Sequence, residues 1–131
     1  MLLIRSIVRP EKKEAVLAEL SKAGFHEAIV VDVVGRGKHV VGRGKHKDIK
    51  VDSMAYDEAP KALISYHLVD WHYEMPKALI LMVVEDRDRD RVIDLILRTA
   101  KTGEKGAFGD GKIFISPVEE AYTISSGTKG L

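Results

Sequence analysis

A glycine-rich segment at residues 102–112 has the composition best suited to chemistry. Its eleven positions hold four glycines and two lysines, between an expected helix and an expected strand. Glycine lets backbone N–H groups approach an anion closely, and a lysine ammonium neutralises the remaining negative charge. The segment therefore predicts a phosphate site. A simple tight turn at Asp110-Gly111 is the alternative, because no standard phosphate-loop motif is matched.

A second glycine-rich segment, Gly35-Arg36-Gly37-Lys38, follows an apolar strand. Glycine there permits positive φ or close approach of a ligand to the backbone. From Arg36 to Lys50, six basic side chains are opposed only by Asp48. This basic arm suits an acidic protein surface, and a solvated loop is the alternative.

The histidines and the single tryptophan form no recognisable catalytic set. His39 and His46 lie on one loop without a paired carboxylate, and His67 and His72 flank Trp71. No Ser-His-Asp triad or carboxylate pair stands out, and the absence of cysteine excludes thiol chemistry, disulfides and cysteine metal sites. We therefore expect a protein that is not an enzyme and has no intrinsic metal. An aromatic loop tip such as Trp71 favours contact with a protein.

Length and charge restrict the class of protein further. A chain of 131 residues with 45% hydrophobic content predicts one domain with its own core. No apolar run approaches the roughly 20 residues of a membrane span, and the chain starts with a strand-like pattern, so we expect a cytoplasmic protein. A net charge of +1 and 6% aromatic residues argue against nucleic acid as a partner.

Hydrophobic periodicity predicts an α+β domain around these segments. Strands are expected at 2–8, 29–34, 78–84 and 112–115, with a last one at 121–124, and helices at 10–24 and 88–100, each ended by a glycine. The order β-α-β-β-α-β is that of the ferredoxin-like sandwich, which fixes no function by itself. A long loop without periodicity separates the second and third strands. Loops of this length are functional or disordered.

Motifs over nearly the whole chain resemble the PII signal-transduction family of GlnB- and GlnK-like proteins. The most specific are Arg98-Thr99-Ala100-Lys101-Thr102-Gly103 and Gly109-Asp110-Gly111-Lys112-Ile113-Phe114. The stretch at 116–123 and the basic pattern at 42–51 are similar to the NifI branch, which is found with nitrogenase genes. The resemblance implies one PII-like domain over 1–131, an extended T-loop at 35–76 and a phosphate-binding B-loop at 102–112.

The resemblance also implies ligands and site residues. Members of this family are homotrimers that bind ATP or ADP in clefts between subunits and sense 2-oxoglutarate together with Mg-ATP. The positions that match the nucleotide cleft are Gly35, Gly37, Lys38, Gly109, Asp110, Gly111 and Lys112. His39 and Lys77 match the positions that meet magnesium and 2-oxoglutarate, with Lys61 as a second candidate because Pro-Lys-Ala-Leu-Ile occurs twice. An ammonium facing a carboxylate is a strong pairing.

Several positions depart from the family pattern. The B-loop carries extra residues, Leu81 replaces an adenine-contacting glutamate, and Thr123 and Ser125 stand where arginines are expected. The T-loop contains an insertion at about 57–72. A PII-like protein that has lost nucleotide binding is therefore one alternative.

The leading hypothesis is a non-catalytic nitrogen regulator that docks its T-loop on a target, with dinitrogenase favoured. The residues expected to contact the partner are Arg36, Arg43, Lys45, Lys47 and Trp71. Alternatives are a PII regulator of an ammonium transporter, which would bring it to a membrane only indirectly, or of a nitrogen-assimilation enzyme. A small ATP hydrolase and a nucleic-acid module are disfavoured. A hetero-oligomer with a paralogous PII protein is a further possibility for its assembly.

Overall fold

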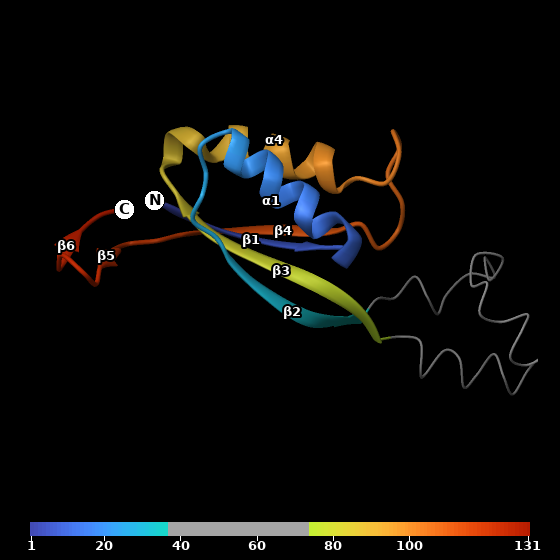
Figure 1. The fold of residues 1–131 in the computed structure, drawn as a ribbon, viewed down its shortest axis with the longest axis horizontal. Helices are drawn as coiled ribbons and strands as arrows, with labels where there is room; N and C mark the ends of the chain where they lie inside the picture. The colour runs from blue at the N-terminus through green and yellow to red at the C-terminus, as the bar shows by residue number, and fades with distance from the viewer. Residues whose placement is uncertain (37–73) are drawn as a thin grey trace, which may run out of the picture. The chain divides into compact units, whose positions relative to one another are not determined.

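The structure is a computed structural model that describes residues 1–36 and 74–131 (Figure 1). The chain divides into two compact units, one formed by Met1–Val33 with Pro76–Leu131 and the other by Val34–Met75. All the core residues, and the loop at 102–112, belong to the first unit. Most of the second unit lies outside the described residues.

A four-stranded sheet organises the first unit. Its strands are β1 (Leu2–Val8), β2 (Ile29–Arg36), β3 (Glu74–Val84) and β4 (Gly111–Pro117), in the order β2-β3-β1-β4. Strand β1 is antiparallel to both of its neighbours, and Ile4 stands opposite Met82 on one side and Ile115 on the other. This order confirms the predicted ferredoxin-like α+β fold.

Two helices cover one face of this sheet (Figure 1). Helix α1 (Lys13–Lys22) follows a 3-10 turn at Pro10–Lys12, and helix α4 (Arg89–Ala100) follows a 3-10 turn at Asp86–Asp88. Proline suits the first turn because it has no N–H to leave unpaired. Val16 and Leu20, one helical turn apart, are both buried, so α1 packs through a single apolar stripe.

The core lies between the helices and the sheet. Alternate residues of β1 point into it, and Ile4, Ser6 and Val8 are almost completely buried. The remaining buried apolar side chains are Val16, Leu20, Ala78, Ile80, Met82, Val84, Val92, Leu95, Ile96 and Ala100. Each large aliphatic side chain contributes about 1.5–3 kcal/mol when it is fully buried.

Several element ends differ from the sequence prediction: β2 continues to Arg36, and β4 spans Gly111–Pro117 rather than 112–115. Strand β3 begins at Glu74 rather than at residue 78, because Pro76 lies beyond the last β1–β3 pair, Val8 with Ala78, and its missing N–H disrupts no bond to β1. Helix α4 ends at Ala100, and Gly103 is not its cap: the Thr102 N–H donates to the Asp110 carboxylate instead of continuing the helix.

The C-terminal segment forms a small hairpin that the sequence only half predicted. Strand β5 (Tyr122–Thr123) pairs with β6 (Thr128–Lys129), and Lys129 lies 2.8 Å from Glu120. Within residues 1–36 and 74–131, no helix is long and apolar enough to cross a membrane.

Candidate functional site

The loop between α4 and β4 is the part of the described chain that best fits an anion site. It runs from Lys101, whose backbone is extended, to Gly111, where β4 begins. Gly111 has φ +121°, and a Cβ at this position would stand 1.7 Å from the backbone oxygen of Ile7. Only glycine therefore allows the loop to enter β4 so close to β1.

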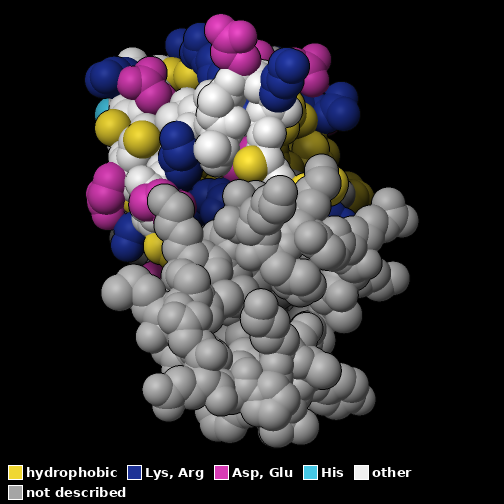
Figure 2. All heavy atoms as spheres, turned by 90° about the vertical axis from the view of Figure 1, so that its right-hand side faces the viewer, with side chains coloured by type: hydrophobic (Ala, Val, Ile, Leu, Met, Phe, Trp, Pro, Cys, Tyr) yellow, Lys and Arg dark blue, Asp and Glu magenta, His cyan; other side chains and the backbone are white. Residues whose placement is uncertain are grey.

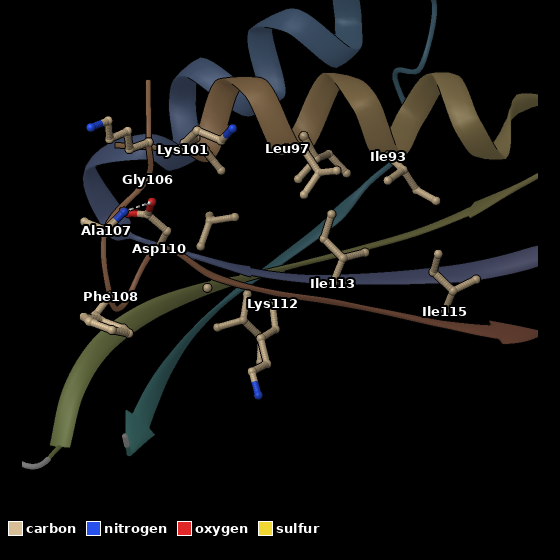
Figure 3. Close-up of a pocket in the computed structure, with 16 residues that line it drawn as sticks. Ile93, Leu97, Lys101, Gly106, Ala107, Phe108, Asp110, Lys112, Ile113 and Ile115 are labelled. Carbon is tan, nitrogen blue, oxygen red and sulfur yellow. Dashed lines mark hydrogen bonds between the residues drawn. The ribbon is translucent and has the colours of Figure 1, made fainter. Parts of the chain in front are cut away.

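Asp110 organises this loop. Its carboxylate accepts hydrogen bonds from the Thr102 backbone N–H (3.0 Å), the Thr102 hydroxyl (2.6 Å) and the Ala107 N–H (2.8 Å). A fourth comes from Arg9 Nε at 3.0 Å. Figure 3 shows the Asp110 side chain turned back towards Ala107, into its own loop. One carboxylate thus ties both ends of the loop together.

These bonds favour the charged form of Asp110. Partial burial raises the pKa of this carboxyl, but the donors on Thr102, Ala107 and Arg9 outweigh burial and hold the pKa well below its usual range. Asp110 is therefore an anion with its acceptor sites occupied by the protein. An anionic carboxylate repels phosphate, so its contribution to an anion site is to shape the backbone.

Two cations, one on the sheet and one directly after it, bind consecutive carbonyls of the loop. Arg9, directly after β1, donates from Nη2 to the Phe108 oxygen at 2.7 Å. Lys77, on β3, donates from Nζ to the Gly109 oxygen. Burial and the neighbouring Arg9 charge lower the pKa of Lys77, while Glu11 and Asp110 oppose the shift. Lys77 therefore contacts the loop, although the motif that contains Lys77 is about thirty residues from the loop in the sequence.

The surroundings of the loop are rich in positive charge. Glu104 and Asp110 are the acidic residues within 101–112, and the lysines there are Lys101, Lys105 and Lys112, all exposed. Figure 2 views the described residues from this side and shows both basic and acidic side chains on their surface, with white backbone and uncharged polar atoms between them. The flexible side chains of these lysines could bring several ammonium groups to a multiply charged anion.

An apolar cavity of about 690 Å³ lies beside the loop, between α4 and the edge strand β4. Ile93 and Leu97 of α4 line it together with Ile113 and Ile115 of β4 (Figure 3). The Lys112 side chain points to the other side of β4 in this view. Lys112 is also one of the residues that line the cavity, but its ammonium points away from α4.

The structure brings together one part of the predicted site. Gly109, Asp110, Gly111 and Lys112 form one end of the loop, and Lys77 contacts it. Gly35 lies on β2, in the second unit, so its position relative to the loop is not described. The remaining predicted site residues lie outside the described backbone or, for Arg36, have an undescribed side chain: Arg36, Gly37, Lys38, His39, Arg43, Lys45, Lys47, Lys61 and Trp71.

Sequence reasoning missed Arg9 and Thr102 as site residues. Arg9 has no predicted role in the site, and Thr102 is included only as part of a motif. The available signal was the pairing of an acidic residue with a nearby threonine at a helix end, because aspartate accepts from free backbone N–H groups. No sequence pattern indicates the contact of Arg9 with a loop about a hundred residues later.

The fold and this loop define a class of protein: a ferredoxin-like α+β domain with a glycine-rich, cation-flanked loop at the edge of its sheet. The family model described as "Nitrogen regulatory protein P-II" matches residues 1–128. The chain therefore belongs to the nitrogen regulatory protein P-II family, which confirms the resemblance seen in its motifs.

Relatives cover the whole chain. The nitrogen fixation nifHD region GlnB-like protein 1 of Methanobacterium ivanovii is 42% identical over 131 residues, which is 100% of both chains. The protein of the same description from Methanococcus maripaludis strain S2 is 41% identical, again over 100% of both. Nitrogen regulatory protein P-II 2 of Methanothermobacter thermautotrophicus is 35% identical over 97% of this chain and 91% of its own. These similarities support a nitrogen regulator of the NifI type.

Proposed function

We propose that this protein is a ligand-responsive regulator that binds ATP or ADP through its 102–112 loop and controls a nitrogen-metabolism enzyme, with dinitrogenase favoured. The observation that carries the proposal is the arrangement of the loop. Asp110 fixes its shape from within, Lys77 of β3 donates to its Gly109 carbonyl, and Lys112 follows the loop at the start of β4. The names of the full-length relatives, from nitrogen fixation regions, favour the target.

Lys77 gives the proposal its sensing step. Its ammonium already contacts the Gly109 carbonyl of the loop, so a 2-oxoglutarate carboxylate bound there would lie next to a nucleotide phosphate. Magnesium between the two anions, with His39 as a neighbour, would offset their repulsion. Binding of 2-oxoglutarate would then depend on Mg-ATP.

Assembly into trimers would complete the nucleotide cleft. On the sheet face opposite the two helices, apolar side chains of neighbouring strands lie side by side, as Ile7 does with Leu79. Phe114 on the same face is 49% exposed. Monomeric proteins seldom leave such a face to water. Size measurement in solution should therefore give a multiple of 14.6 kDa, with three copies expected.

Regulation would act through the segment 35–76. A small ligand changes docking only if it binds two states of this segment with different affinities. The basic residues Arg36, Arg43, Lys45 and Lys47 would attract an acidic target surface and Trp71 would contact it.

The test is calorimetric titration of the purified protein with Mg-ATP, and then with 2-oxoglutarate in the presence and absence of Mg-ATP. We expect 2-oxoglutarate to bind only with the nucleotide. Failure of both to bind would refute the sensing proposal and favour a PII-like protein without nucleotide binding. A variant with Arg43, Lys45 and Lys47 neutralised should keep ligand binding but lose inhibition of dinitrogenase, whereas full inhibition would exclude the basic arm from docking.

A further inference from the structure

The contacts of Arg9 suggest a function for a residue that lies outside the loop. Arg9 follows β1 and precedes the 3-10 turn at Pro10–Lys12, so its backbone is fixed between a central strand and the start of the first helix. Its side chain is only 24% exposed. From this rigid position the guanidinium reaches across to the 102–112 loop.

The guanidinium makes two bonds to the loop at different points. Nε donates to the Asp110 carboxylate at 3.0 Å, and Nη2 donates to the Phe108 carbonyl at 2.7 Å. The fork of an arginine holds two acceptors in a fixed geometry, which a lysine ammonium does not. Arg9 therefore fixes both the side chain that shapes the loop and the backbone just before it.

These bonds set the direction of a backbone donor. The peptide between Phe108 and Gly109 is trans, so its N–H points opposite to its carbonyl. With that carbonyl held by Arg9, the Gly109 N–H is directed away from Arg9. The next carbonyl, of Gly109, is held by Lys77. Two consecutive peptide units are thus oriented by cations of the sheet.

We propose that Arg9 is a positioning residue for nucleotide binding: through Asp110 and the Phe108 carbonyl it holds the loop in the conformation that presents backbone N–H groups to a phosphate. This inference rests on the proposed function. It assigns to the β1 terminus a part in the site that the composition of the loop does not indicate.

The experiment compares Mg-ATP affinities of matched variants by calorimetry. Arg9→Ala should weaken binding about ten- to hundredfold, because small displacements of positioned groups cost this much. Arg9→Lys should rescue only part of the loss. Arg5→Ala is the matched control: Arg5 lies on β1 itself, and its described hydrogen bond is to the Ser116 hydroxyl of β4, at 2.8 Å, and not to the loop. Its affinity should be unchanged.

A charge-neutral variant separates positioning from direct contact with phosphate. Thr102→Val removes one hydroxyl donor from the same Asp110 oxygen that Arg9 holds, without changing any charge. If Arg9 acts by positioning, Thr102→Val should also weaken Mg-ATP binding, by a few fold. In addition, amide resonances of Gly106, Gly109 and Gly111 should shift in both ligand-free variants and stay in place in Arg5→Ala.

The outcomes distinguish this inference from the function on which it rests. A wild-type protein that binds no nucleotide refutes the proposed function and the role of Arg9 together. Normal wild-type binding with an unchanged Arg9→Ala affinity refutes only the role of Arg9. A loss of affinity in Arg9→Ala without any shift of the Gly106, Gly109 and Gly111 amide resonances means that Arg9 meets the phosphate directly, which overturns positioning.

Discussion

Gly111 and Ile7 meet so closely that no side chain fits between them: a Cβ on Gly111 would stand 1.7 Å from the Ile7 backbone oxygen. The contact lies where the loop enters β4 beside β1. The glycine is therefore required by the sheet itself, whether or not a phosphate binds nearby.

Gly111→Ala should destabilise the fold strongly. The methyl group forces β4 away from β1, and φ of +121° is unfavourable for alanine. Together, overpacking and backbone strain should cost roughly 2–5 kcal/mol of unfolding free energy, measured by urea denaturation. Gly24→Ala is the control, because φ is +96° there but no atom lies within 4 Å of the added Cβ. Equal losses in the two variants would contradict the steric argument.

Asp110→Asn should make the protein less sensitive to acid. The folded-state pKa of Asp110 lies below its usual value, so the charged form stabilises the fold above the ordinary pKa near 3.8 and this contribution is lost as the pH falls below it. At pH 7 the variant should lose roughly 1.5–3 kcal/mol of unfolding free energy, the range for a hydrogen bond to a charged group.

Urea unfolding at pH 7 and pH 3 measures this effect. The difference between wild type and Asp110→Asn should shrink at the lower pH. Asp94→Asn serves as the control. The Asp94 side chain is 74% exposed and pairs with Arg98 at 3.6 Å, and such surface pairs contribute little to the unfolding free energy. A wild type and an Asp110→Asn variant that differ equally at both pH values would refute the stabilising role of the charge.

The fold was predictable from the sequence because its core elements are amphipathic. Val16 and Leu20 repeat at helical spacing, and residues 78–84 are continuously apolar, so periodicity alone placed both layers. The composition of 102–112 likewise indicated an anion loop. The full role of Asp110 was not predictable, because its partner Arg9 becomes a neighbour only when β4 pairs with β1.

Ser6→Ala should stabilise the protein. Ser6 is completely buried on the core face of β1, and its hydroxyl has no hydrogen-bond partner in the described part of the chain. An unsatisfied buried hydroxyl is unfavourable, so its removal should raise the unfolding free energy by about 1 kcal/mol. Ser116→Ala, which removes the acceptor of the Arg5 bond, should have the opposite sign. A Ser6→Ala protein that is less stable than wild type would indicate a bound partner for this hydroxyl.

The duplicated Pro-Lys-Ala-Leu-Ile motif offers an internal test of the sensing step. Lys77 and Lys61 have the same neighbours in sequence, but Lys77 contacts the loop carbonyl of Gly109, while Lys61 lies outside the described residues. Methionine keeps the unbranched stem and removes the ammonium. Lys77→Met should therefore weaken 2-oxoglutarate binding in the presence of Mg-ATP.

The expected loss is about ten- to hundredfold, which corresponds to one charge-assisted hydrogen bond. Lys61→Met should bind 2-oxoglutarate like the wild type. Calorimetric titration at saturating Mg-ATP measures both variants under one condition, and Mg-ATP titration alone shows whether Lys77→Met still holds the nucleotide. If Lys61→Met loses 2-oxoglutarate binding and Lys77→Met keeps it, the first copy of the motif is the sensor, and the bond between Lys77 and Gly109 serves only to fix the loop.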